Sequence, residues 1–321
     1  MFSLLKHIKT FPMGGTHPHD HKLTARREVQ ELPLPKMVHI PVVQHIGAPA
    51  EPAVEKGDMV KAGQVIAASK GFVSANVHSS VSGRVAKIDR YLDSSGYKKM
   101  VITIRVKGDE WVPEADLSPD LKTNIKLSRE EIIEKIAASG IVGMGGAAFP
   151  AHVKLSVPKG KKADCLILNG VECEPYLTAD HRLMLEKTSE ILVGAQVLMK
   201  ALNVQKCVIG IENNKGDALQ AMDYLCAEFP GISVQPLEVK YPQGGEKQLI
   251  KALLNREVPS GGLPIDVGAV VHNVGTAFSV YEAVQKNKPL VARIVTVTGH
   301  SLLKPGNFRV RVGTPIEHLI E

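Results

Sequence analysis

Residues 140–150 read GIVGMGGAAFP, with four glycines and two alanines in eleven positions. So many small residues either form a tight turn or leave bare backbone against which a large ligand can lie. A helix is predicted directly before this loop, because Ser128 and Glu131 form a capping-box pattern and isoleucines follow at helical spacing. Gly140 is the expected end of that helix. The sequence around the loop decides between the turn and the ligand.

Beyond the loop, the sequence alternates between short apolar runs and longer helical patterns. The predicted strands are 164–169, 206–213, 232–239 and 269–274. The predicted helices between and after them are 181–202, 215–229, 245–255 and 275–286. The first strand is apolar throughout its centre, as expected when both faces of a parallel sheet are covered. This alternation predicts an α/β layered fold.

Polar residues and glycines follow each of the four predicted strands. The segments after the strands are Asn169–Pro175, Glu212–Gly216, Tyr241–Glu246 and His272–Thr276. Because ligands of open α/β sheets bind beyond the carboxyl ends of the strands, four such segments favour a binding site over four unrelated turns. Glycine N–H groups suit phosphate oxygens and asparagine amides suit the edge of a heterocycle. The residues alone predict a nucleotide-type ligand that carries the reaction, since no Ser-His-Asp or H-E-x-x-H pattern is present.

Residues 38–108 consist of short β-branched runs broken by turn residues, which indicates a small all-β unit. Its sequence resembles the biotinyl/lipoyl type of barrel-sandwich domain. In such domains an acceptor lysine lies at a hairpin tip, and here Phe72 occupies that place, with Lys70 offset from it. We therefore expect the barrel-sandwich fold without the swinging-arm function.

Composition limits the classes of protein to which this chain can belong. The 321 residues exceed one ordinary domain, 44% are hydrophobic, and no run approaches the length of a membrane span. The N-terminus does not resemble a secretory signal, and the four scattered cysteines form no C-x-x-C pair, so we expect a reduced, cytoplasmic protein. A net charge of +6 with only 4% aromatic residues argues against nucleic-acid binding.

The histidines His17, His19 and His21 near the N-terminus leave two interpretations open. They could be metal ligands, but their i, i+2 spacing in a proline-containing segment is more typical of a surface arm, and no carboxylate or cysteine partner with ligand spacing is evident. We therefore predict no metal site.

The glycine loop and the strand-end motifs resemble the flavin- and NADH-binding subunit of respiratory complex I. The loop motif of that family matches at Gly143, Gly145, Gly146, Ala147, Phe149 and Pro150, followed by Lys154. Its Asn-Ala-Asp-Glu-x-Glu-Pro motif matches at Asn169, Glu172, Glu174 and Pro175, with Gly170 and Val171 replacing Ala-Asp. Its Tyr-x-x-Gly-Glu-Glu motif loses one acid at Gly245, and its Asn-Asn-Val-Glu-Thr motif reads His272-Asn273-Val274-Gly275-Thr276.

The whole chain, including GGTHPHDHK (14–22) and YPQGGEKQLIKALLNREVPSGGLP (241–264), resembles the RnfC family of Rnf (Rsx) electron-transport complexes. The resemblance implies an N-terminal arm (1–30), a barrel-sandwich hybrid domain (31–125), an α/β FMN- and NADH-binding domain (126–290) and the start of a β-grasp (SLBB) domain (291–321). It also implies two 4Fe–4S clusters in the full-length protein. We expect this chain to end inside the third unit, before their ligands.

The same resemblance assigns the site residues. The residues expected to bind FMN are Gly143, Gly145, Gly146, Lys154, Asn169, Tyr241, Gly244, Glu246, Asn273 and Thr276. The residues expected to bind NADH are Phe149, Glu172 and Glu174. No catalytic side chain is expected, because the flavin performs the bond chemistry. The free carboxylates are expected to favour NADH over NADPH.

The resemblance further implies hydride transfer from NADH to a non-covalent FMN, with electrons leaving through the clusters towards ferredoxin and coupled to ion pumping. The expected partners are the other subunits of a membrane-bound Rnf-type complex and, indirectly, ferredoxin. The expected location is the cytoplasmic face of the inner membrane, as a peripheral protein.

Three alternatives remain. One is a non-catalytic scaffold such as the A subunit of the sodium-pumping NADH:quinone oxidoreductase, although the intact glycine loop speaks against it. Another is a flavin-dependent corrin reductase, in which the flavin domain comes first rather than after the barrel-sandwich domain. The third is a binding or assembly module that is not itself an enzyme.

Overall fold

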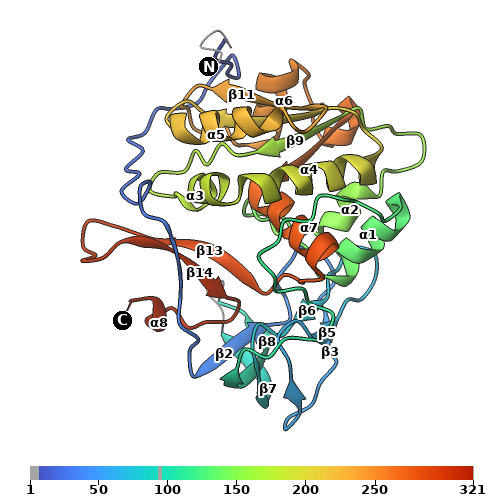
Figure 1. The fold of residues 1–321 in the computed structure, drawn as a ribbon, viewed down its shortest axis with the longest axis vertical. Helices are drawn as coiled ribbons and strands as arrows, with labels where there is room; N and C mark the ends of the chain where they lie inside the picture. Colours follow the sequence, from blue (N-terminus) through green and yellow to red (C-terminus); the bar gives the residue numbers. More distant parts are fainter. Residues whose placement is uncertain (1–6, 93–95, 321) are drawn as a thin grey trace.

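The computed structural model describes residues 7–92 and 96–320, which form four β-sheets with helices around one of them (Figure 1). The all-β unit lies at one end of the molecule and the α/β unit at the other. A third sheet lies between them in this view.

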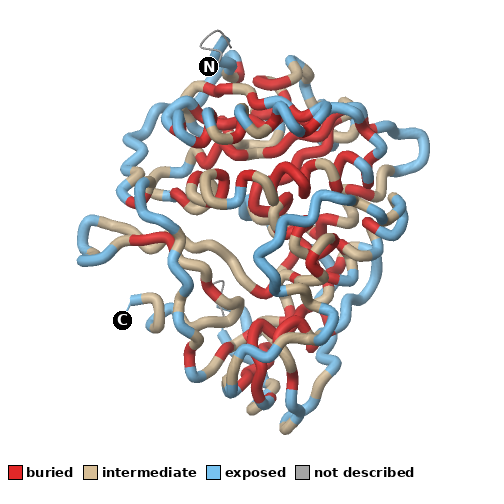
Figure 2. The backbone as a smooth tube through the Cα atoms, in the orientation of Figure 1, coloured by how far each residue is buried: buried red, intermediate tan, exposed pale blue. Residues whose placement is uncertain are grey.

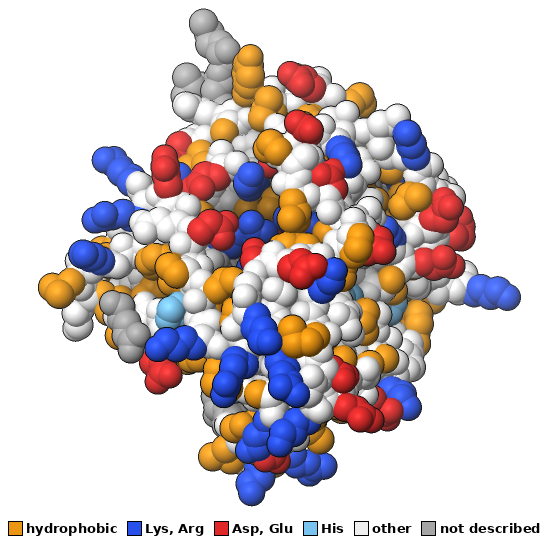
Figure 3. Space-filling view, turned by 60° about the horizontal axis from the view of Figure 1, so that its bottom comes forward, with side chains coloured by type: hydrophobic (Ala, Val, Ile, Leu, Met, Phe, Trp, Pro, Cys, Tyr) orange, Lys and Arg blue, Asp and Glu red, His pale blue; other side chains and the backbone are white. Residues whose placement is uncertain are grey.

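The barrel-sandwich unit consists of two antiparallel sheets. The larger sheet contains β2 (Met37–Pro41), β8 (Lys98–Gly108), β7 (Ser82–Leu92) and β4 (Met59–Val60), in that order. The smaller contains β3 (Glu51–Pro52), β5 (Val65–Ala68) and β6 (Val77–His78). Alternating side chains such as Ile40, Ile66 and Ile104 are fully buried in one core. On the face that Figure 3 brings forward, Lys and Arg side chains gather around this unit.

The α/β unit is built on a four-stranded parallel sheet. Its strands, in spatial order, are β11 (Ile232–Leu237), β10 (Cys207–Glu212), β9 (Cys165–Asn169) and β12 (Ala269–Asn273). Its helices are α1 (Arg129–Ala138), α2 (Ala151–Leu155), α3 (Ala179–Glu186), α4 (Thr188–Leu202), α5 (Gly216–Cys226), α6 (Glu246–Leu254), the 3-10 helix η1 (Pro264–Val267) and α7 (Val274–Lys286). All four strands lie within the ranges predicted from sequence.

Two hydrophobic cores cover the two faces of this sheet. Leu166 and Leu168 of β9 face the larger core, which contains residues of α1, α4, α5 and α7, whereas Ile167 faces the smaller core under α6. This two-sided burial explains the continuous apolar sequence of β9. Figure 2 shows the buried backbone concentrated along the sheet and the helices that pack on it.

Two helix predictions have different outcomes. The capping box at α1 is confirmed, because the Ser128 hydroxyl accepts from the Glu131 N–H at 3.2 Å and the Glu131 carboxylate accepts from the Ser128 N–H at 2.6 Å. The single helix predicted over 181–202 is wrong, since α3 and α4 are separated at Lys187. At the break, the Thr188 hydroxyl donates to the Met184 carbonyl oxygen at 2.5 Å, in competition with the backbone bond of a continuous helix.

The third sheet joins distant parts of the chain. Its strands are β1 (Val29–Glu31), β14 (Gly306–Arg311) and β13 (Ala292–Val297), followed by the short helix α8 (Glu317–Ile320). β1 pairs with β14 in parallel, with Val29 opposite Asn307. The N-terminal arm therefore runs along the α/β unit, enters this sheet and then continues into the barrel-sandwich unit (Figure 1).

Candidate functional site

The glycine loop lies between α1 and α2 and is held from two sides. The Met144 N–H donates to the Thr276 hydroxyl of α7 at 3.0 Å, and the Arg293 guanidinium of β13 donates to the Met144 carbonyl oxygen at 3.0 Å. The Gly143 N–H also closes the loop by donating to the Phe149 carbonyl oxygen at 2.8 Å. The loop is thus closed by a backbone hydrogen bond between its ends and held at Met144 by two clamps, the Thr276 hydroxyl and the Arg293 guanidinium.

The tip of this loop presents unpaired backbone donors. Within the part of the chain that the structure describes, the N–H groups of Gly145, Gly146 and Ala147 have no hydrogen-bond acceptor. Gly146 has φ +113°, a conformation that L residues rarely adopt, and the space where a Cβ would stand is open. Exposed N–H groups on a glycine loop are the donors that phosphate and heterocycle acceptors require.

Asparagines at two strand ends lie next to each other and to the loop. The Asn169 amide of β9 donates to the Gly244 carbonyl oxygen at 2.9 Å, and the Asn273 amide of β12 donates to the Asn169 carbonyl oxygen at 3.3 Å. A Cβ added to Gly145 would contact the Asn273 side chain at 3.4 Å. The structure therefore brings the glycine loop and three of the predicted strand ends to one place.

The lysine that follows the loop also points to the strand ends. Lys154 of α2 contacts the Glu246 carboxylate at the start of α6 at 2.6 Å and the Val271 carbonyl oxygen at 3.0 Å. Both side chains are about a third exposed, so the pair remains within reach of a ligand.

His272 of β12 is buried, and its Nε2 has no hydrogen-bond partner among the described residues. Burial first, and the charge of Lys154 second, lower its pKa to about 3, so the imidazole is neutral at physiological pH. This favours packing over acid–base catalysis for His272. The Nε2 of His272 and the N–H groups at the loop tip are thus polar atoms whose hydrogen bonds the described residues leave unfilled.

The two predicted NADH-binding carboxylates have different surroundings. The Glu172 side chain is buried and accepts hydrogen bonds from the N–H groups of Asp180 at 2.7 Å and His181 at 3.3 Å, at the start of α3. Burial first, and the Asp180 carboxylate second, raise the pKa of Glu172 from 4.5 to about 7. Glu174 is exposed. Of the two side chains, only that of Glu174 is open to a ligand in this arrangement.

Two other predicted residues and the neighbouring Cys173 lie at the periphery of the site. Tyr241 is 40% exposed, is followed by a cis peptide bond to Pro242, and exchanges backbone hydrogen bonds with Thr16. Phe149 is half-buried beside the loop, where its carbonyl oxygen accepts from Gly143. Burial raises the pKa of the Cys173 thiol to about 11, so this thiol is protonated at physiological pH and is a poor nucleophile.

Sequence reasoning did not assign Asp180 or Arg293 to the site, and it included Glu212 and Lys215 only as part of a polar segment after a strand. Asp180 accepts from the Asn273 amide at 2.6 Å, and burial raises its pKa. Lys215 and Glu212 form a buried pair at 3.2 Å, and Lys215 also donates to the Val171 carbonyl oxygen at 2.8 Å. Asp180 follows the Glu-x-Glu-Pro motif closely and could have been included with it. Arg293, by contrast, lies far from every motif, and no sequence signal points to it.

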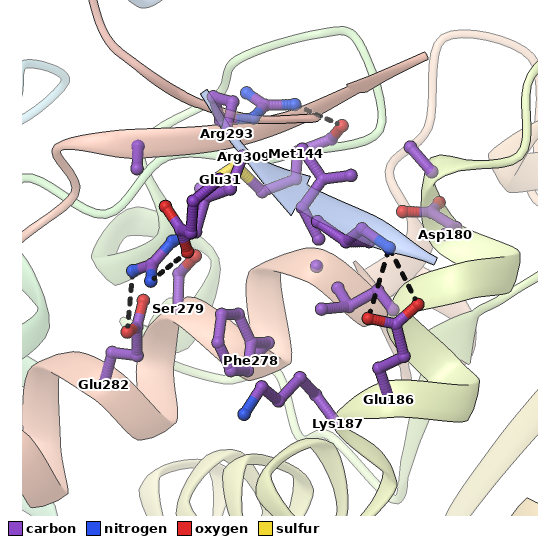
Figure 4. Close-up of a pocket in the computed structure, with 16 residues that line it drawn as sticks. Glu31, Met144, Asp180, Glu186, Lys187, Phe278, Ser279, Glu282, Arg293 and Arg309 are labelled. Carbon is purple, nitrogen blue, oxygen red and sulfur yellow. Dashed lines mark hydrogen bonds and ion pairs between the residues drawn. The ribbon is translucent and has the colours of Figure 1, made fainter. Parts of the chain in front are cut away.

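A pocket of about 190 Å³ lies behind the glycine loop, between α3, α7 and the third sheet (Figure 4). It shares Met144 and Asp180 with the candidate site. Its charged walls are largely paired within the chain: Arg309 contacts Glu31 at 3.3 Å and Glu282 at 3.4 Å. The pocket therefore lacks the free donors that distinguish the loop side.

Neither a metal cluster nor a membrane span is found among the described residues. No group of three or more His, Cys, Asp or Glu side chains in this part of the chain is arranged to hold a metal ion. No helix within the same residues combines the length and apolar character needed to cross a bilayer. His19 and His21 instead take part in an aromatic group with Tyr176 and His300, and the His21 ring stacks on Tyr176 at 4.9 Å.

Comparison with known families gives two matches along the chain. The "RnfC Barrel sandwich hybrid domain" family matches residues 9–110, and the "Nuo51 FMN-binding domain" family matches residues 136–282. An NAD+-reducing NiFe-hydrogenase crystallised in the air-oxidized state shares the fold, with a TM-score of 0.51 at 19% identity over 60% of this chain and 38% of that chain.

Curated relatives match nearly the whole chain. The C subunit of the proton-translocating ferredoxin:NAD(+) oxidoreductase complex of Clostridium ljungdahlii is 50% identical over 98% of this chain and 68% of its own length. The C subunit of the ion-translocating oxidoreductase complex of Rhodobacter capsulatus is 43% identical, with 96% and 59% covered. The C subunit of the Na(+)-translocating ferredoxin:NAD(+) oxidoreductase complex of Acetobacterium woodii is 42% identical, with 96% and 69% covered.

This chain spans 59% to 69% of the length of these three relatives. The matched families cover both the all-β unit and the α/β unit, in the order that the fold presents them. The chain belongs to the RnfC family of ion-translocating oxidoreductase complexes, with a barrel-sandwich hybrid domain followed by an FMN-binding domain of the complex I type.

Proposed function

We propose that this chain is the electron-entry subunit of a membrane-bound, ion-translocating ferredoxin:NAD(+) oxidoreductase complex. It binds FMN non-covalently, takes a hydride from NADH and passes electrons on to iron–sulfur clusters outside the residues of this chain. The observation that carries the proposal is the clamped glycine loop, which has free N–H groups at Gly145, Gly146 and Ala147 and approaches Asn273 at Gly145. The relatives' names and the FMN-binding family match support the same function.

FMN, when bound, supplies the hydride acceptor and the ability to release electrons one at a time. The residues that would hold it are Gly143, Gly145, Gly146, Lys154, Asn169, Gly244, Glu246, Asn273 and Thr276, with Tyr241 at the edge of the site. Loop N–H groups would satisfy phosphate or ring acceptors, and the Lys154 ammonium would add positive charge. The clamps on Met144 keep these donors in place before the ligand arrives, which lowers the entropy lost on binding.

NADH would bind on the outer side of the loop, near Phe149 and the 172–177 segment. The half-buried Phe149 ring offers a stacking surface, and the exposed Glu174 carboxylate can accept from a ribose hydroxyl. Glu174 would also repel a 2′-phosphate, which favours NADH over NADPH. Glu172 acts through the start of α3, because its carboxylate is already bonded there.

The proposal extends to location and partners. As part of such a complex, the chain would lie at the cytoplasmic face of the membrane as a peripheral subunit. Its direct partners would be the other subunits, and ferredoxin would exchange electrons with it only indirectly. The support for these partners is the names of the relatives, which describe subunits of ion-translocating complexes.

An anaerobic flavin experiment tests the proposal. The purified chain is saturated with FMN, freed of unbound flavin and mixed with NADH while the flavin absorbance is followed. Retained flavin that is bleached by NADH supports the electron-entry role. A chain that retains no flavin contradicts the site and favours the scaffold alternative, whereas retention without bleaching contradicts the NADH assignment.

A pair of threonine variants makes the test specific to the loop. Thr276→Val removes the hydroxyl that accepts from Met144 and is expected to raise the FMN dissociation constant about fivefold, since one neutral hydrogen bond contributes about 1 kcal/mol. Thr314→Val is the matched control, because its hydroxyl bonds to the Arg311 carbonyl oxygen in another unit. Equal effects of the two variants on FMN binding would contradict the clamp.

A further inference from the structure

The N-terminal arm forms the outer wall of the 172–177 segment. Thr16 and Tyr241 exchange backbone hydrogen bonds at 2.8 Å, so the arm runs beside the loop that precedes α6. Further along, the Tyr176 N–H donates to the Asp20 carbonyl oxygen at 2.8 Å. The Thr24 hydroxyl then contacts the Thr178 hydroxyl at 2.5 Å. The arm is thus fixed on both sides of Lys22.

Lys22 reaches from the arm into the segment that carries the proposed NADH ligands. Its ammonium donates to the carbonyl oxygens of Glu172 at 2.8 Å, Glu174 at 2.9 Å and Leu177 at 2.7 Å. An ammonium group has three donors, and here all three find an acceptor. Burial lowers the pKa of Lys22, while the Glu172 carboxylate opposes that effect.

The bonded segment has a backbone that needs outside support. Glu172 has φ 49° and Tyr176 has φ 70°, so two of the six residues 172–177 are non-glycine residues in the left-handed region. Each such residue costs of the order of 1 kcal/mol relative to an ordinary conformation. Three carbonyl oxygens that converge on one point also repel each other unless a cation lies between them. Lys22 supplies that cation.

We propose that Lys22 is a positioning residue, which holds the 172–177 segment in the shape that admits NADH. The inference rests on the proposed function for its link to NADH, but not for its link to the shape of the segment. In this role the N-terminal arm belongs to the site, because loss of the Lys22 ammonium would leave three carbonyl oxygens without their donor. FMN binding is expected to be independent of Lys22, because the clamps on the glycine loop come from Thr276 and Arg293.

The test uses the full chain loaded with FMN and compares Lys22→Ala with Lys9→Ala. Lys9 is the matched control, because it joins the same arm to the same unit through the Leu253 carbonyl oxygen at 3.2 Å, away from the segment. In anaerobic stopped-flow reduction, Lys22→Ala is expected to raise the NADH concentration for half-maximal rate about tenfold, equivalent to about 1.4 kcal/mol. The limiting rate and the FMN dissociation constant are expected to stay within about twofold of the wild-type values, since these bonds act on neither.

Rescue by a small cation separates positioning from a general defect in folding. Lys22→Ala leaves a hole lined by carbonyl oxygens, which ammonium or methylammonium can enter. Either ion is expected to restore the NADH dependence of Lys22→Ala, whereas choline, which has no N–H donor, is not. Equal rescue by choline, or none by methylammonium, would overturn the positioning role.

Hydrogen exchange distinguishes failure of this inference from failure of the proposed function. Backbone amides of residues 172–178 are expected to exchange faster in flavin-free Lys22→Ala than in wild type or Lys9→Ala. Unchanged exchange, or an unchanged NADH dependence, overturns the inference alone. A wild-type chain that NADH does not reduce overturns the proposed function and, with it, the link between Lys22 and NADH.

Discussion

Ionisation of Glu172 is expected to lower the free energy of unfolding of the wild-type protein as the pH rises. Replacing Glu172 by glutamine is expected to abolish this pH-dependent loss. The Glu172 side chain is only 9% exposed, and its pKa is raised from 4.5 to about 7, first by burial and second by the Asp180 carboxylate. A carboxyl group with a raised pKa in the folded state binds its proton more tightly there than in the unfolded chain. Its stabilising contribution is therefore complete below pH 4.5 and is lost as the pH rises through about 7.

The size of this change in unfolding free energy follows from the difference between the two pKa values of Glu172. From 4.5 to about 7, at about 1.4 kcal/mol for each pH unit, the ionised side chain lowers the free energy of unfolding by about 3 kcal/mol. Glutamine keeps an oxygen that can accept from the Asp180 N–H but never ionises. The unfolding free energy of Glu172→Gln, relative to wild type, is expected to rise by about 3 kcal/mol between about pH 4 and about pH 8.

Urea unfolding followed by circular dichroism at a series of pH values measures this difference. Glu174→Gln is the matched control, because the Glu174 side chain lies two residues away and is exposed rather than buried. Asp180→Asn is expected to lower the pKa of Glu172 by removing the neighbouring charge, which shifts the transition to lower pH. A pH-independent difference for Glu172→Gln would refute the reasoning that burial and Asp180 oppose its ionisation.

Three further predictions concern the packing and the ends of helices. Gly194→Ala would place a Cβ 2.0 Å from the Ala277 carbonyl oxygen where α4 crosses α7, so thermal unfolding is expected several degrees lower; an unchanged Tm would contradict this close approach. Lys215→Met leaves the buried Glu212 carboxylate without its partner and is expected to lower the unfolding free energy by about 3–5 kcal/mol, less when combined with Glu212→Gln, as measured by urea titration. Ser128→Ala removes the cap of α1 and is expected to destabilise the protein by about 1 kcal/mol in the same titration, and a change near zero would mean that the capping box contributes nothing.

The order of strands and helices in the α/β unit could be predicted because its signals are local. Each strand is a short apolar run and each helix has its own apolar face, so the elements follow from residues that are close in sequence. The break at Lys187 has no signal in the helical pattern, and the bond of the Thr188 hydroxyl to the Met184 carbonyl oxygen that accompanies it is seen only in the folded chain. The strand formed by Val29–Glu31 also escaped prediction, since its pairing partner lies at the other end of the chain.

The residues of the candidate site also differ in this respect: some lie in sequence motifs, whereas others depend on contacts between distant parts of the chain. The loop and the asparagines at the strand ends carry sequence motifs, and the structure places them together. Lys22 lies in the GGTHPHDHK segment, but neither its role nor that of Arg293 could be predicted, because each acts through backbone carbonyl oxygens and any residue can supply that acceptor. A helix-start role for the Glu172 carboxylate could be predicted from sequence, but its hydrogen bonds to the N–H groups of Asp180 and His181 depend on the folded chain.

The pairing of β1 with β14 also sets an order of events during synthesis. The ion pair between Glu31 and Arg309 spans 278 residues, so β1 leaves the ribosome long before its partner strand exists. At about 5–20 residues per second, that interval is roughly 15–55 s. The α/β sheet can form in the meantime, since its four strands are complete by Asn273. The end of the arm at β1 is therefore held only after β14 emerges, later than the α/β unit with which Lys22 makes its hydrogen bonds.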